Sequence, residues 1–172
     1  MSTRCATIVK QQSVYYDGTK EDELFRFYRH CDGYPSGHGL DMAEAFIAAE
    51  ERGTADKDRW FSQGLNNRNW VQKCFAELFA ADCDLEVEPP RVQHWDIEFL
   101  YVIEGVYDAS GGKHNIDSLP VTIAVYDAYV EGEKAWDDDS KWSYDLVMQQ
   151  EPLFKGNPHE FKAWVEAERK GF

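Results

Sequence analysis

The stretch from residue 94 to 104, HWDIEFLYVIE, is the clearest strand in the sequence, and the other elements are interpreted around it. Side chains of a strand alternate between the two faces of a sheet. The alternation places five apolar side chains on one face: Trp95, Ile97, Phe99, Tyr101 and Ile103. The other face begins with three polar side chains: His94, Asp96 and Glu98. A strand with one partly polar face is typical of an antiparallel sheet.

Further strands are expected on both sides of this one. Residues 4–10 and 24–30 alternate in the same way, and the turn signal Asp17-Gly18 lies between them. This pattern predicts an N-terminal antiparallel hairpin with a long connection. Residues 121–130 are rich in β-branched and aromatic side chains and predict another strand.

Three helices are predicted from apolar residues at helical spacing. The first begins at Leu40 and ends at Gly53, and the second covers 69–81. The third begins with Asn157 as its N-cap and Pro158 as its first helical residue. A short element is also expected near 144–148.

The order of these elements predicts an α+β fold, in which about three helices pack on an antiparallel sheet. The chain has 172 residues, a length that suits a single domain spanning 1–172. It contains no apolar run of a signal peptide and no stretch of about 20 apolar residues, so we expect a cytoplasmic protein.

The net charge is strongly negative, with 18 Lys and Arg against 32 Asp and Glu, which gives −14. Residues 1–38 are neutral, so the whole excess lies in 39–172. Because phosphate backbones and acidic membranes are bound through cations, neither is expected as a partner. The same negative field attracts a basic protein.

Two regions concentrate the negative charge and predict a surface for a basic partner. The first alternates before Pro89-Pro90, and the second is a predicted loop with tryptophans. Their residues are Asp82, Asp84, Glu86 and Glu88, and Trp136, Asp137, Asp138, Asp139 and Trp142. Carboxylates beside aromatic rings can imitate the charge and stacking of a nucleic acid. The alternative is an acidic surface that serves solubility alone.

A second set of polar residues could carry chemistry if two strands are neighbours. The set comprises His30, Asp32, His94, Asp96 and Glu98. Imidazoles and carboxylates suit a divalent metal such as zinc or manganese, with His30, His94 and Asp96 as candidate ligands. The same groups could perform acid–base chemistry without a metal. Alternatively, the residues of 30–35 serve the turn that they form.

Two motifs carry a resemblance to a known family. The stretch 28–35, YRHCDGYP, resembles the Arg-His-x-Asp-Gly-Tyr-Pro signature of a family of small phage, prophage and plasmid-borne proteins. The stretch 96–101, DIEFLY, is similar to that family's Asp-Ile-Glu-Tyr-x-Tyr strand, and 2–8 is similar to its opening. The resemblance implies an origin in a mobile element, and therefore a bacterial host cell, and no particular chemistry. Cys31 departs from the aromatic or polar residue expected there.

Together these features predict an interaction protein of a mobile element. Its acidic surface would block the nucleic-acid-binding site of a basic host protein, for example a defence protein. The sequence has no Gly-x-Ser-x-Gly elbow and no His-Glu-x-x-His pair, which favours a protein that is not an enzyme and needs no cofactor. The alternative is a small metal-dependent or acid–base hydrolase that uses the His, Asp and Glu cluster.

Overall fold

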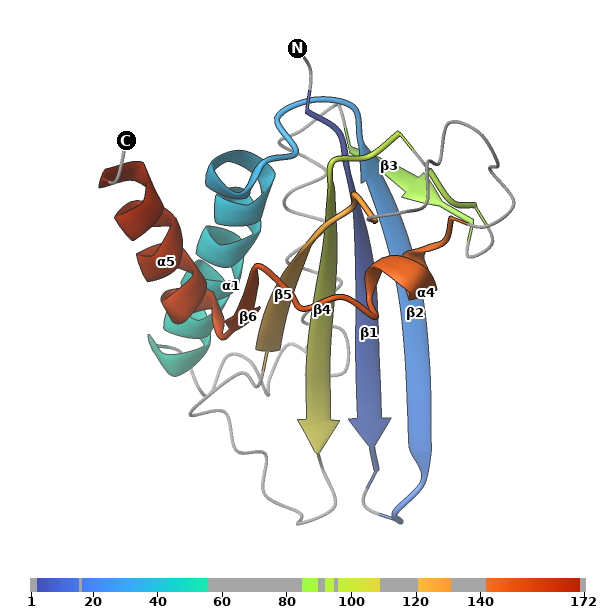
Figure 1. The fold of residues 1–172 in the computed structure, drawn as a ribbon. Helices are drawn as coiled ribbons and strands as arrows, with labels where there is room; N and C mark the ends of the chain where they lie inside the picture. Colours follow the sequence, from blue (N-terminus) through green and yellow to red (C-terminus); the bar gives the residue numbers. More distant parts are fainter. Residues whose placement is uncertain are drawn as a thin grey trace.

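The computed structural model describes residues 3–15, 17–55, 85–89, 92–94, 96–108, 121–130 and 142–170. Its described strands form one six-stranded sheet in the order β3-β2-β1-β4-β5-β6 (Figure 1). The strands are β1 (Cys5–Val14), β2 (Lys20–Arg29), β3 (Leu85–Glu88), β4 (Phe99–Asp108), β5 (Val121–Asp127) and β6 (Phe154–Gly156). The helices are α1 (Leu40–Ala55), α4 (Tyr144–Val147) and α5 (Pro158–Lys170), and a π-helical turn, Pro35–Gly39, precedes α1. The predicted α+β class is confirmed.

The N-terminal hairpin is confirmed, but its connection is short. The β1 and β2 strands pair from Cys5 with Arg29 to Val14 with Lys20. The turn between them is closed by the backbone N–H of Tyr15, which donates to the carbonyl of Thr19 at 2.8 Å. Gly18 has φ +79°, a conformation that glycine adopts without steric cost. Both strands reach the turn, so the prediction of a long connection was wrong.

The sheet is mixed, whereas an antiparallel one was predicted. Strand β4 runs parallel to β1, with Cys5 opposite Phe99 and Val14 opposite Asp108. The other pairs of neighbouring strands in the described sheet are antiparallel. Alternation of side chains reports which face a residue occupies and carries no information about strand direction, and for this reason the parallel pair was missed.

Strand β4 also begins later than predicted. Its pairing with β1 starts at Phe99, because β1 itself starts at Cys5. The residues before Phe99 continue past the end of the sheet, where the N–H of Glu98 donates to the carbonyl of Arg4 at 2.9 Å. His94, Asp96 and Glu98 therefore do not share one face of a strand.

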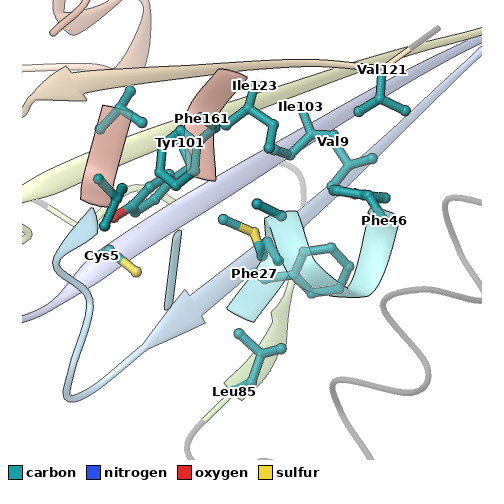
Figure 2. Close-up of a cluster of buried hydrophobic side chains, with 14 of the residues drawn as sticks. Cys5, Val9, Phe27, Phe46, Leu85, Tyr101, Ile103, Val121, Ile123 and Phe161 are labelled. Atoms are coloured by element: carbon teal, nitrogen blue, oxygen red, sulfur yellow. The ribbon is translucent and has the colours of Figure 1, made fainter. Parts of the chain in front are cut away.

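Both faces of the sheet are covered. On one face, α1 and α5 lie side by side (Figure 1) and enclose the cluster drawn in Figure 2. That cluster includes Cys5, Val9, Phe27, Phe46, Tyr101, Ile103, Ile123 and Phe161. The opposite face packs under α4 and includes Ala6, Ile8, Tyr28, Leu100, Val102, Trp142, Tyr144 and Val147. Alternate residues of β1 thus enter opposite cores.

The described helices agree with the sequence-based expectation. The predicted helix from Leu40 is α1, but it continues to Ala55, so the prediction that Gly53 ends it was wrong. The predicted element near 144–148 is α4. The helix predicted over 69–81 lies outside the described residues. No helix in the described part of the chain is both long and apolar enough to cross a membrane.

Helix α5 begins as predicted. The side chain of Asn157 accepts a hydrogen bond from the N–H of Glu160 at 2.9 Å, and the carboxylate of Glu160 accepts one from the N–H of Asn157 at 2.8 Å. This reciprocal pair satisfies two N–H groups that the helix itself leaves without partners. It fixes where α5 starts and so places Phe161 against the core.

We predict that Asn157→Ala lowers the free energy of unfolding by about 1 kcal/mol, because the alanine cannot accept the hydrogen bond at the helix start. Asn157→Asp should preserve most of the stability, since a carboxylate is an equally good cap. Urea denaturation followed by circular dichroism measures both variants. An Asn157→Ala variant as stable as the wild type would show that the cap contributes nothing.

Candidate functional site

Three of the five residues predicted to carry chemistry lie together, at the edge of the sheet formed by β2 and β3. His30 follows β2, while His94 and Asp96 precede β4, and all three side chains lie close to Tyr28. The side chains of Asp32 and Glu98 are exposed, and no hydrogen bond or ion pair with another described residue joins them to this group. We call Tyr28, His30, Glu86, Glu88, His94 and Asp96 the edge cluster.

The register of β2 and β3 explains why these residues meet. Tyr28 lies opposite Glu86, and Arg26 lies opposite Glu88. Directly opposite residues in a sheet project from the same face, so both glutamates share the face of Tyr28. This is the face of α4, because Tyr28 belongs to the same buried cluster as Tyr144.

His94 and Glu88 form an ion pair at the centre of the edge cluster. Nε2 of His94 contacts Oε1 of Glu88. Glu88 is only 8% exposed, and its other oxygen, Oε2, is buried without a hydrogen-bond partner among the described residues. Burial raises the pKa of Glu88, while the nearby His94 opposes that rise. A carboxylate in this position has a strong preference for a proton donor such as the imidazole N–H.

Tyr28 is buried and contacts His30, His94 and Asp96 of the edge cluster. Its ring stacks on His94 with 4.0 Å between centroids, and the ring of His30 meets it edge-on at 4.7 Å. Its hydroxyl donates to Oδ2 of Asp96 at 3.4 Å. Burial first, and then the negative charge of Asp96, raises the pKa of Tyr28 to about 12. The phenol therefore stays protonated at neutral pH and acts as a donor.

The acidic groups at the margin of the cluster have partners of their own. Nη1 of Arg4 binds Oδ2 of Asp96 at 2.6 Å, and Nδ1 of His94 lies 3.9 Å from Oδ1 of the same carboxylate. His30 Nε2 lies 3.2 Å from Oε1 of Glu86, and both of these side chains are exposed. Asp96 thus faces both a guanidinium and an imidazole.

The segment that carries His94 is held by Tyr144 of α4. The backbone N–H of His94 donates to the Tyr144 hydroxyl at 3.1 Å, and the N–H of Tyr144 donates to Gln93 Oε1 at 2.9 Å. The guanidinium of Arg26 lies 5.3 Å from the centroid of the Tyr144 ring and donates to the carbonyl of Val92 at 3.2 Å. These contacts fix the position of the imidazole relative to β2 and β3.

The chemistry that this geometry favours is proton transfer. The cluster contains an imidazole, a buried carboxylate and a protonated phenol within one set of contacts, which are the groups that acid–base catalysis uses. Among the described residues, no group of three or more His, Cys, Asp or Glu side chains is placed to hold a metal ion. The metal-site hypothesis for His30, His94 and Asp96 therefore has no geometric support in the described residues.

The predicted partner surface is only partly described. Glu86 is exposed, but Glu88 is buried against His94. Trp142 was predicted to be exposed, and this was wrong: it is 7% exposed, and its Nε1–H donates to the carbonyl of Ala128 at 3.2 Å. The remaining residues of that prediction lie outside the described ones: Asp82, Asp84, Trp136, Asp137, Asp138 and Asp139.

A second histidine, His38, belongs to the π-helical turn and is buried against the sheet. Arg29 Nη1 donates to Nδ1 of His38 at 3.1 Å, so Nε2 carries the proton and donates to Thr7 Oγ1 at 3.0 Å. Burial, with a smaller contribution from Arg29, lowers the pKa of His38 to about 3. The sequence offered one signal for this contact: an arginine and a histidine lie on either side of a segment rich in turn residues.

The turn from Asp32 to Gly39 is built around this histidine. The carbonyl of Asp32, a residue with φ +53°, accepts a hydrogen bond from the N–H of His38 at 2.9 Å. Gly33 lies so close to Cys5 that a Cβ on residue 33 would lie 2.8 Å from the backbone nitrogen of Cys5. The hydroxyl of Tyr101 donates to the Gly33 carbonyl at 2.8 Å. These contacts support the structural interpretation of this turn.

No family model matches the chain, and no curated protein or solved structure matches it either. Function is therefore inferred from the contacts, burial and charge of the chain's own residues.

We predict that His38 makes the fold sensitive to acid. Its folded-state pKa of about 3 lies below the ordinary value of 6.5, so the unfolded chain binds a proton that the folded chain does not. Stability is therefore fully present above pH 6.5 and falls as the pH drops toward 3, by about 1.4 kcal/mol per pH unit from this group.

The measurement is the free energy of unfolding between pH 7.5 and pH 5 for the wild type, His38→Gln and His159→Gln. His38→Gln should show the shallower dependence on pH, while His159→Gln, which changes an exposed histidine paired with Glu50, should follow the wild type. Equal slopes in all three proteins would refute the assignment.

Proposed function

We propose that the protein is an interaction protein of a mobile element, which binds a basic host protein through its acidic surface and blocks a nucleic-acid-binding site there. The excess of negative charge, −14, supports this. A field of this sign attracts basic surfaces over several ångströms and repels nucleic acid itself. A defence nuclease is the kind of partner that this chemistry fits.

The observation that carries the proposal is that many Lys and Arg side chains of the described residues are bound within the molecule. Arg4 binds Asp96, Arg29 binds His38 and Asp41, and Lys162 binds Glu44. Arg26 and Arg169 donate to backbone carbonyls, and Lys10 donates to the sulfur of Met148. These cations are engaged within the molecule and are less available to a nucleic acid.

Many carboxylates, in contrast, remain open to solvent. Six exposed ones form no hydrogen bond or ion pair with another residue in the described part of the chain: Asp32, Glu98, Glu104, Asp145, Glu151 and Glu168. They lie on several elements, including α4 and α5. Such groups add to the negative field that attracts a basic partner, although the proposed contact lies elsewhere in the chain.

The contact is proposed to centre on Trp136 and the three aspartates 137–139, for which the sequence predicts a loop. We expect the triple change Asp137→Asn, Asp138→Asn and Asp139→Asn to weaken partner binding about tenfold or more, because complementary fields accelerate association by about 10–10³. A charge-matched control replaces Asp145 by Asn and both Glu151 and Glu168 by Gln. It removes the same charge elsewhere and should reduce binding far less.

The partner is first isolated on immobilised protein from a nuclease-treated bacterial lysate, washed at low and high salt, and identified by mass spectrometry. Its affinity for the wild type and both variants is then measured by calorimetry, with duplex DNA as a competitor. Binding that is lost at high salt and displaced by DNA is expected. A partner that DNA does not displace, or no salt-sensitive partner at all, would refute the blocking role.

A further inference from the structure

The edge cluster has a feature that partner binding does not require: an imidazole oriented by a buried carboxylate. We propose that His94 and Glu88 form a general acid–base pair that hydrolyses carboxylic esters with water as the nucleophile. This activity is independent of the interaction function, because Glu88 is buried and His94 is only partly exposed. The proposal rests on the contacts of His94 with Glu88, Tyr28 and Tyr144.

The ion pair determines which nitrogen of His94 is the base. Glu88 Oε1 lies against Nε2, so Nε2 carries the proton when the imidazole is neutral. The lone pair is then on Nδ1, whose nearest described charged group is the Asp96 carboxylate at 3.9 Å. That distance is too long for a direct hydrogen bond, which leaves Nδ1 available to a water molecule or a substrate.

Glu88 orients this base. Its Oε2 is enclosed and has no hydrogen-bond partner among the described residues, so the carboxylate is poorly solvated. A poorly solvated carboxylate stabilises a positive imidazolium beside it more strongly than a solvated one does. An acid–base group held by a second residue in this way acts as catalytic dyads and triads do.

The imidazole is also fixed in place before any substrate binds. Stacking on Tyr28 sets the plane of the ring, and the bond from the His94 N–H to the Tyr144 hydroxyl sets the backbone. Both tyrosines are buried, and both have a raised pKa because of burial. Preorganisation of this kind is what a catalytic group requires to act without reorganising.

The charges around His94 select the class of substrate. Glu88 and Asp96 lie beside the imidazole, and their negative charges disfavour phosphate esters and other anions. Arg4, whose side chain is 44% exposed, contacts Asp96 through Nη1 and has further N–H donors on the same guanidinium. Those donors can stabilise the negative charge that develops on a carbonyl oxygen. An uncharged or cationic carboxylic ester fits these requirements.

The reaction balances without any other reagent. Nδ1 of His94 removes a proton from water while the water oxygen forms a bond to the carbonyl carbon. The π-electron pair moves to the carbonyl oxygen, which faces Arg4. When that pair returns, the bond to the leaving alkoxide breaks and the imidazolium returns the proton to it. One ester and one water become one acid and one alcohol.

The test uses the full chain with 4-nitrophenyl acetate, and bis(4-nitrophenyl) phosphate as the anionic comparison. The wild type should hydrolyse the acetate with a rate that rises with pH as an imidazole loses its proton, and should leave the phosphate intact. His94→Gln should reduce kcat/KM roughly a hundredfold or more, the usual contribution of a general base. His159→Gln removes an exposed histidine elsewhere and should leave kcat/KM unchanged.

Two further variants separate catalysis from folding. Arg4→Gln changes an exposed residue and should lower kcat with little effect on KM, because Arg4 stabilises charge that appears only in the transition state. Glu88→Gln should lower kcat and shift the pH profile, since it removes the carboxylate that orients the imidazole. If folded His94→Gln and Arg4→Gln hydrolyse the acetate as fast as the wild type, the proposal is wrong.

Discussion

The whole structure depends on the pairing of β1, which is hydrogen-bonded along its full length to β2 on one side and to β4 on the other. A strand in this position has no free edge, and its residues alternate between the two cores. Cys5 and Val9 enter the core under α1 and α5, and Ala6 and Ile8 enter the core under α4. Every other described strand is placed relative to this central one.

The position of the edge cluster follows from that constraint. Apolar side chains from β1 and β4 fill the middle of the α4 face, and the outer strands β2 and β3 contribute polar ones at its margin. A polar group at such a margin is partly buried and partly solvated. Its charge is therefore supported by neighbours without being cut off from substrate or water. Glu88 lies on the buried side of this margin, and His94 lies on the partly solvated side.

Much of the local structure could be predicted from the sequence, because local rules decide it. The Asp17-Gly18 turn and the cap at Asn157 both form as expected, since each depends on a few adjacent residues. The direction of β4 could not be predicted in this way. Parallel pairing depends on the path of the intervening chain, and the alternation of side chains is the same in either direction.

The candidate site could be predicted only in part, because it also depends on the long-range pairing of strands. His30, His94 and Asp96 were identified by residue type, and they do meet. Glu88 was interpreted as a surface charge, because alternating acidic residues before a proline pair usually face water. Its role depends on the register of β3 against β2, a long-range relation that no local pattern encodes.

Alternate residues at the start of the 28–35 motif have different surroundings, because neighbouring residues of a strand face opposite sides of the sheet. Arg29 points toward the helices and holds His38, so it belongs to the fold. Tyr28 and His30 contact each other in the edge cluster, on the other side of the strand. Loss of His30 would leave the buried contacts of His38 in place, whereas loss of Arg29 would remove a donor from a buried imidazole. A chain with this motif can therefore keep the buried contacts of Arg29 while His30 varies, and the presence of the motif alone is evidence for the fold only.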